Sequence, residues 1–220
     1  TEGFTDVALE NGAHFVARIS SPVYKLNEKN ELIHVGVHYE NRKYTKEPAN
    51  YILKFRTENH MGNQISIPFE MLKNQQDYGF ELAVQKGAWS FQSEYEMAGY
   101  HTLTHNYTIK GYYVLASYFL TGDHRTYKEG IFSRVNPKNN FDFNAKTYGA
   151  LEMLIRYSGF DYSDVVLGDY ENQVNSWALG MNWYFNSNAR LVYNYVITNF
   201  NQAGENHPLN QHLVRVQVDF

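Results

Sequence analysis

The stretch SWALGMNWYFNSNARLVYNYVI, residues 176–197, contains two runs in which large apolar side chains alternate with small or polar ones. In the first run the large apolar residues recur at every second position from Trp177 to Phe185, and in the second they recur from Leu191 onward. Successive side chains of a β-strand point to opposite sides, so this period of two predicts two strands that each have one apolar face. The Asn-Ser-Asn sequence at 186–188 predicts a tight turn, and therefore an antiparallel pair.

The same alternation recurs about ten times along the chain. The predicted strands are residues 12–20, 31–39, 50–57, 78–85, 89–97, 107–120, 151–157, 176–185, 190–197 and 214–220. The predicted apolar face of 50–57 consists of Tyr51, Leu53 and Phe55, and that of 107–120 consists of Ile109, Tyr113, Leu115 and Phe119. This pattern predicts an all-β chain with antiparallel strands.

Charged residues within these strands occupy the face opposite the apolar one. The set comprises Arg18, Lys54, Arg56, Glu81, Glu94, Glu96, Lys110, Glu152, Arg156, Arg190, Arg215 and Asp219. A bilayer enforces such one-sided exclusion, because a Lys or Arg at the bilayer midplane costs roughly 2 to 4 kcal/mol. A soluble β-sandwich or lipocalin-like barrel would also alternate, with its apolar residues inside. The apolar faces end in Tyr, Trp and Phe, like the interfacial girdles of membrane barrels, and this favours a transmembrane β-barrel.

Composition excludes several other classes of protein. The 220 residues contain 19 Lys or Arg and 23 Asp or Glu, and the resulting net charge of −4 excludes a general nucleic-acid binder. The absence of Cys excludes a disulfide-stapled domain. No stretch approaches the roughly 18 to 20 uninterrupted apolar residues of a membrane-spanning helix. The chain begins at Thr1 without a signal-peptide pattern, so we expect any secretion signal to lie outside these residues.

The connections alternate in length, as expected for a bacterial outer-membrane barrel with short periplasmic turns and long external loops. If the last strand descends to the periplasm, the segments 58–75, 158–173 and 198–211 are external, and the turns at 86–87 and 186–188 are periplasmic. The segment 121–146 is long but falls on the periplasmic side. Either the strand count is wrong or this connection folds back into the lumen.

Several sequence motifs in one order resemble a known family. They are FRTENH (55–60), FELAVQKGAWSFQSEYEMAGY (80–100), GYYVLASYFLTGDHRTYKEGIFSRVNP (111–137), GALEMLIRYSGFD (149–161) and WALGMNWYFNSNARLVYNY (177–195). Together they resemble the C-terminal part of the phosphate-selective porin O and P family. The resemblance covers about residues 49–220, whereas the first 48 residues fit by pattern only. The terminal Phe220 also matches the aromatic C-terminus of outer-membrane barrels.

The resemblance implies a sixteen-stranded outer-membrane porin, usually a homotrimer, through which small anions diffuse passively. Its surroundings would be outer-membrane lipid and lipopolysaccharide. It also implies connections that fold into the lumen, which would explain the long segment 121–146. About ten strands are present here, so residues 1–220 are expected to be the C-terminal portion of a single barrel domain.

The charged face would then line the pore, where Arg and Lys favour anions and Asp and Glu favour cations. The basic candidates on the wall are Arg18, Lys54, Arg56, Lys110, Arg156, Arg190 and Arg215, and those in the inward-folding connection include Arg125 and Arg134. They slightly outnumber the acidic wall residues, which predicts a weak anion preference. Arg56 is the first choice for selectivity, because its planar guanidinium suits phosphate. The alternative is that these charges pair with one another, for example Arg156 with Glu152 on one face.

Other functions have weaker support in the sequence. His34 and His38 are about 13 Å apart along a strand, and His101 and His105 have no third ligand, so we expect no metal site and no cofactor. A ten-stranded outer-membrane protease would need paired Asp and an Asp-His couple at the rim. The acidic candidates are Asp161, Asp164, Asp169 and Glu171, with His207 nearby. No catalytic motif accompanies them, so we do not expect an enzyme. A non-conducting barrel that serves as a scaffold in an envelope complex is a further alternative.

Overall fold

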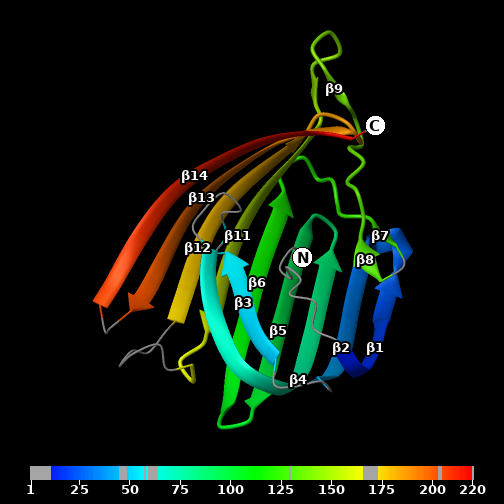
Figure 1. The fold of residues 1–220 in the computed structure, drawn as a ribbon. Coiled ribbons are helices and arrows are strands. Elements are labelled where there is room, and N and C mark those ends of the chain that lie inside the picture. Colours follow the sequence, from blue (N-terminus) through cyan, green and yellow to red (C-terminus); the bar gives the residue numbers. More distant parts are fainter. Residues whose placement is uncertain are drawn as a thin grey trace.

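The computed structural model describes residues 11–44, 49–56, 58, 64–128, 130–165, 173–202 and 205–219. Its ten long strands (Figure 1) are β1 (Asn11–Leu26), β2 (Glu31–Tyr44), β3 (Ala49–Arg56), β4 (Gln64–Lys86), β5 (Trp89–Thr102), β6 (Asn106–Phe119), β11 (Ala150–Asp161), β12 (Gln173–Tyr184), β13 (Ala189–Gln202) and β14 (Glu205–Val218). Short elements are the 3₁₀ helix η1 (Asn27–Lys29) and the strands β7 (Tyr127–Lys128), β8 (Ile131–Phe132), β9 (Phe141–Asp142) and β10 (Thr147–Tyr148). Within these described ranges no helix is long and apolar enough to cross a membrane.

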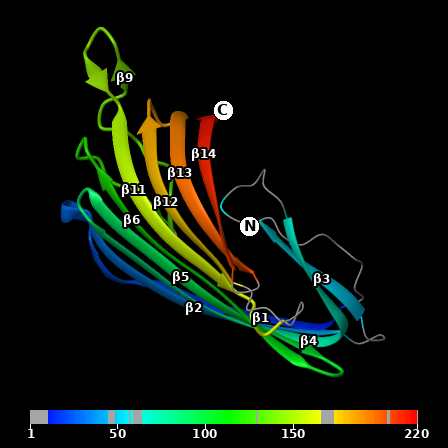
Figure 2. The ribbon, with the colours of Figure 1, turned by 90° about the vertical axis from the view of Figure 1, so that its left-hand side faces the viewer.

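The long strands form one antiparallel sheet with the order β1-β2-β4-β5-β6-β11-β12-β13-β14, and β3 pairs with β4 alone. This sheet is a curved wall, and β3 lies on the side toward which the wall curves (Figure 2). We call that side the inner face and the opposite side the outer face. The end of the wall that carries η1 and the turn at 186–188 is called the short-turn end.

All ten predicted strands are present, but the expectation of ten neighbouring wall strands is wrong for β3. The part of β4 after Asn74 lies between β2 and β5, whereas residues 64–72 pair with β3. The strand changes course at Met71, which has a φ of 54°, next to a register shift between Leu72 and Asn74. Residues 64–75 are therefore strand, which corrects the prediction of an external loop over 58–75.

The outer face is apolar, as the alternation predicts. Its exposed side chains include Phe15, Ile19, Ile33, Val37, Phe80, Met153, Ile155, Leu179, Val214 and Val216. Ile19 is 77% exposed and Val216 is 70% exposed. Exposure of such apolar side chains to water costs free energy, whereas contact with lipid does not. Aromatic pairs lie near both ends of this face: Tyr39 with Tyr78 and Tyr157 with Trp177 at one end, and Trp89 with Tyr118 and Trp183 with Phe185 at the short-turn end.

The predicted orientation of β6 is wrong. Ile109 and Phe119 are buried on the inner face, while Tyr112 and Val114 are exposed outside. Both faces of β6 are rich in large apolar residues, so its alternation does not indicate which face is outside. The inner set is apolar because other segments cover it: Ile109 lies under the β3–β4 hairpin, and Phe119 packs with Val135.

The prediction that the apolar face of β3 contacts lipid is also wrong. Tyr51 is buried, and Leu53 and Phe55 pack against the same apolar cluster on the inner face of the wall. This cluster consists of Tyr51, Ile67, Phe69, Leu72, Tyr100, Ile109, Tyr162, Val165 and Val174. The hairpin thus covers the wall with its own apolar side.

The connections agree with the predictions in part. The short turns at 87–88 and 186–188 are present, and the long connection between β6 and β11 is confirmed. The predicted loop 198–211 is mostly strand, because β13 continues to Gln202 and β14 begins at Glu205. Phe220 lies outside the described residues.

Candidate pore wall and constriction

The β3–β4 hairpin is held on the inner face by stacked aromatic rings. The rings of Phe69 and Tyr100 lie 4.4 Å apart between centroids and are almost parallel, at 6°. At the other side of the hairpin, the Phe55 and Phe160 centroids are 4.0 Å apart. Aromatic pairs in contact contribute about 0.5 to 1.5 kcal/mol each beyond the area they bury. The hairpin is therefore a packed part of the wall's inner face.

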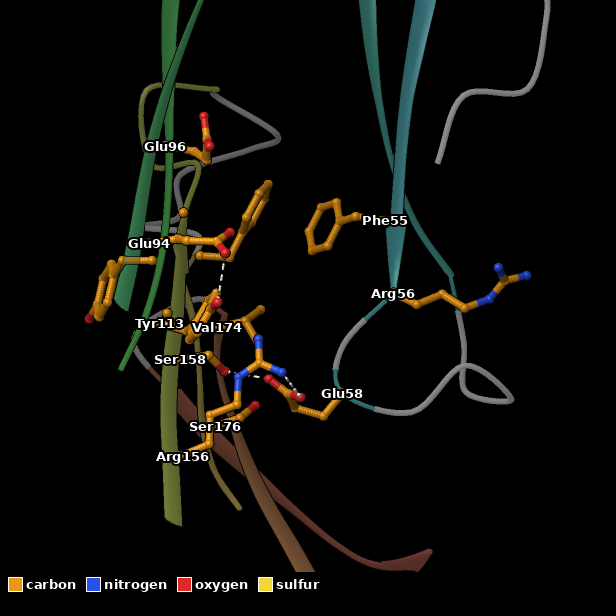
Figure 3. A pocket seen from close by; sticks show the side chains of 14 residues that line it. Phe55, Arg56, Glu58, Glu94, Glu96, Tyr113, Arg156, Ser158, Val174 and Ser176 are labelled. Carbon is orange, nitrogen blue, oxygen red and sulfur yellow. Dashed lines mark hydrogen bonds and ion pairs between the residues drawn. The ribbon is translucent and has the colours of Figure 1, made fainter. Parts of the chain in front are cut away.

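A polar contact adds to this apolar one where the hairpin turns. The Nη1 atom of Arg156 lies 3.0 Å from Oε2 of Glu58, and the Ser158 hydroxyl donates to Oε1 of Glu58 at 2.6 Å (Figure 3). The guanidinium carbon of Arg156 also lies 4.5 Å from the centre of the Tyr113 ring. Arg156 is on the inner face as predicted, but it pairs with Glu58 and not with Glu152.

These residues border a cleft of about 460 Å³ between the hairpin and the wall. Its charged residues are Arg56, Arg156, Glu58, Glu94 and Glu96. The Tyr113 hydroxyl donates to Glu94 at 2.7 Å, and Nε2 of His38 lies 3.0 Å from Glu96. In Figure 3 the Phe55 side chain points toward the wall, while that of Arg56 points away from it. Arg56 thus borders the cleft but directs its charge to the other side of β3.

The long connection between β6 and β11 forms a second covering on the inner face. Arg125 donates to Oε1 of Glu152 from both Nε, at 3.0 Å, and Nη2, at 2.7 Å. Glu152 is 0% exposed, and it also accepts from Ser117, Asn182 and Tyr184. Because five hydrogen bonds saturate this carboxylate, the pair anchors the connection to the wall. The charge of Arg125 is neutralised there.

A chain of polar contacts fixes the same connection nearer the β1 edge. The Tyr127 hydroxyl is 2.7 Å from Nδ1 of His34, whose Nε2 is 3.0 Å from Glu81. Arg18 donates to the same Glu81 oxygen at 2.6 Å. Partial burial, and next the negative charge of Glu81, raise the pKa of Tyr127, so its hydroxyl stays protonated near neutral pH. Gly36 leaves the space that the Glu81 side chain fills, since a Cβ there would collide with it.

The remaining basic candidates lie in three different places. Arg134 is 3.2 Å from Asp219 at the short-turn end, where Arg190 donates to Gln217. These side chains border a second cleft of about 380 Å³. Lys54 shares the side of β3 turned away from the wall with Arg56. Arg215 lies opposite Val192 in register, which places it on the inner face of the edge strand β14.

Lys110 is on the outer face, contrary to the prediction. It is opposite Met97 in the register with β5 and opposite Asp161 in the register with β11. Its neighbour at the next outward position is Tyr112, which is exposed on that face. Lys110 follows the corrected orientation of β6, and it lies near the strand's end, where a long side chain reaches the polar interface.

Three residues have central roles in these contacts that the sequence did not predict: Glu58 and Tyr127, which it did not single out, and His34, which it considered only as a metal ligand. No local motif marks them, because their partners are between 47 and 100 positions away along the chain. The sequence does contain one signal of the second strand of the hairpin, which is the alternation of Ile65, Ile67 and Phe69. Pro68 interrupts that run and obscures the strand.

The residues considered for a protease or a metal site have other contacts. Asp161 accepts from Ser163, and Asp164 accepts from the backbone N–H of Thr108. Asp169 and Glu171 lie outside the described residues, as does the side chain of His207. In the part of the chain that the structure describes, no three His, Cys, Asp or Glu side chains are grouped to hold a metal ion.

The chain is similar to known porins over most of its length. The model of the family described as phosphate-selective porin O and P matches residues 7–220. An uncharacterized protein of Caulobacter vibrioides is 29% identical over an alignment of 150 positions, which covers 65% of this chain and 30% of that protein. Porin O of Pseudomonas aeruginosa is 32% identical over an alignment of 149 positions, which covers 61% of this chain and 32% of that protein. The chain thus spans about a third of the length that these curated relatives have.

The family match confirms the resemblance seen in the sequence motifs and extends it to the first strands. It also agrees with a curved antiparallel sheet whose outer face is apolar and whose inner face carries the ion pairs. This chain belongs to the phosphate-selective porin O and P family, whose members are proteins of the bacterial outer membrane.

Proposed function

We propose that the chain is the C-terminal portion of an outer-membrane porin through which small hydrophilic solutes diffuse passively, with a weak preference for anions. Family membership supports a channel rather than an enzyme. The edges at β1 and β14 are not paired with each other, and unpaired edges are not viable in lipid. Strands outside these residues would complete the barrel, up to the sixteen of the family.

The observation that best supports the proposal is the packing of the β3–β4 hairpin against the inner face. A diffusion pore needs a wall that excludes lipid and a constriction that limits the size of the solute. The hairpin provides such a constriction, since the aromatic cluster and the contact between Glu58 and Arg156 both hold it in place.

The weak anion preference follows from which charges are paired. Among the described residues, five carboxylates of the inner face and its coverings are each in contact with an arginine: Glu40 with Arg42, Glu58 with Arg156, Glu81 with Arg18, Glu152 with Arg125 and Asp219 with Arg134. Within the described part of the chain, Lys54, Arg56 and Arg215 have no carboxylate at ion-pair distance, whereas Glu94 and Glu96 contact only Tyr113 and His38. Glu70 lies on the same side of the hairpin as Lys54 and Arg56 and offsets one of their charges, so the basic side chains act on a solute with only slightly less compensation. The excess is small, so the preference is weak.

Conductance in planar bilayers tests this function. The whole protein should form stable ohmic channels, and a salt gradient should give a reversal potential displaced modestly toward that of the anion. Small phosphate-bearing or other anionic solutes are the proposed cargo. An absence of conductance from correctly inserted protein would favour the second candidate, a non-conducting scaffold. The two inner coverings, the hairpin and the segment 121–135, support that candidate because both narrow the lumen.

The proposed surroundings are outer-membrane lipid and lipopolysaccharide, and the proposed assembly is a homotrimer by analogy with the family. The native mass of the detergent-extracted protein, corrected for bound detergent, distinguishes a trimer from a monomer.

A further inference from the structure

The β9–β10 hairpin projects beyond the short-turn end of the wall (Figure 1). Its fold is well defined by local hydrogen bonds. The Asp142 carboxylate accepts from the backbone N–H groups of Asn144, at 2.8 Å, and Ala145, at 3.2 Å. Lys146 has a φ of 54°, and the Thr147 hydroxyl donates to the carbonyl of Asn140 at 2.6 Å. These bonds hold the backbone of the hairpin in one conformation.

The hairpin is attached to the end of β12 through its outer face. The backbone N–H of Phe141 donates to the carbonyl of Phe185 at 2.7 Å, and the indole N–H of Trp183 donates to the carbonyl of Tyr148 at 2.7 Å. The Phe141 ring contacts the rings of Trp183 and Phe185 edge to face. Trp183 is opposite Leu151 and follows the outward alternation of β12, so the hairpin continues the outer face.

The outermost rings of the hairpin have no covering in the structure. Phe143 is 87% exposed, the highest value among the exposed large apolar residues, and Tyr148 is 68% exposed. On the same end of the outer face, the rings of Trp89 and Tyr118 are in contact, with their centroids 4.5 Å apart and their planes tilted by 38°. The exposed Lys146 accompanies the rings. Aromatic rings with a nearby Lys are typical of the boundary between lipid headgroups and acyl chains.

We propose that the β9–β10 hairpin is a membrane anchor that inserts Phe143 and Tyr148 into the phospholipid interface of the periplasmic leaflet. The hairpin continues the lipid-facing surface past the ends of the strands, which favours lipid over any other occupant. It sets the depth of this part of the barrel in the bilayer, since burial of each ring stabilises one vertical position. This inference depends on the membrane location and not on conduction.

Site-directed spin labelling tests the proposal in the whole protein, because these 220 residues contain no Cys. Any cysteine elsewhere in the protein is first replaced by serine. Phe143→Cys is labelled with a nitroxide and reconstituted in vesicles of phosphatidylethanolamine and phosphatidylglycerol. Val216→Cys on the outer face is the lipid control, and Asn188→Cys in a short turn is the water control. All three side chains are exposed, so a label has room at each position.

The collision rates of the label with oxygen, which concentrates in lipid, and with a water-soluble nickel chelate are then compared. The proposal expects an oxygen-to-nickel ratio at position 143 several-fold above that at 188 and near that at 216. A ratio equal to that at 188 would place the hairpin in water and overturn the proposal. Low rates with both reagents, together with an immobile label, would mean that a second protein copy covers the hairpin, which would also overturn it.

Discussion

The carboxylate of Glu58 spans Arg156 and Ser158 at once, 3.0 Å from the guanidinium and 2.6 Å from the hydroxyl. It joins the tip of the inner hairpin to the middle of the wall across about 100 positions of sequence. The contact neutralises Arg156 and holds the constriction in place. Its removal therefore tests both the electrostatics of the pore and the width of the pore.

We expect Glu58→Gln to increase the preference for anions, because Arg156 then carries an uncompensated charge toward the cleft. The amide keeps the shape of the side chain but loses the ion pair, and the partly exposed contact is worth about 1 kcal/mol. The reversal potential in a salt gradient measures the effect. Asp161→Asn is the charge-matched control, because Asp161 lies opposite Lys110 in the register of β6 and β11 and therefore on the outer face. Equal shifts for both variants would contradict a specific role of Glu58.

Arg56 and Lys110 should differ in their effect on ion selectivity. Arg56→Gln removes a charge from the side of β3 that faces away from the wall and into the lumen, so the reversal potential should move toward that of the cation. Lys110→Gln removes the same charge from the outer face and should leave the potential unchanged. A shift with Lys110→Gln that equals the shift with Arg56→Gln would refute the orientation of β6.

Glu152→Ala should destabilise the protein strongly. The fully buried carboxylate is the common acceptor for Arg125 and three wall side chains, so its removal leaves a half-buried guanidinium and several donors without their partner. Breaking a buried ion pair in this way costs about 3 to 5 kcal/mol. The urea midpoint of the folded barrel, followed by its shifted mobility in gels, measures the loss. Glu96→Gln serves as control, because its half-exposed pair with His38 is worth under about 1 kcal/mol.

Two glycines with positive φ should respond differently to alanine. Gly87, with a φ of 57°, has no atom within 4 Å of an added Cβ, so Gly87→Ala should cost only the backbone strain of about 1 kcal/mol. At Gly149, with a φ of 70°, the Cβ would collide with the carbonyl oxygen of Tyr184. Gly149→Ala should therefore lower the stability by clearly more. Equal urea midpoints for the two variants would argue against the close approach of the 120–149 connection to β12.

The sequence identified the strands and most of their faces without the structure. Lipid excludes charged residues from the face of a strand that contacts it. In β1, β2, β4 and β12 the resulting alternation is clear enough to predict which face is outside. These features depend only on residues that are close together in the chain, so a sequence pattern is sufficient to predict them. The length and side of the connection 121–146 left open a wrong strand count or a fold-back into the lumen, and the resemblance implied the fold-back. The structure places Arg125 and Val135 on the inner face, whereas the β9–β10 hairpin of the same connection projects past the short-turn end (Figure 1).

The tertiary structure alone decided where β3 lies, which face of β6 is outside and which charges neutralise one another. A strand that covers the inner face also has one apolar side, so Tyr51, Leu53 and Phe55 alternate just as lipid-facing residues do. The partners of Arg156 and Arg125 are brought together by the curvature of the sheet and the return of the hairpin. The physical reason is that alternation reports whether a face is apolar, and not whether lipid or another segment of the protein covers it.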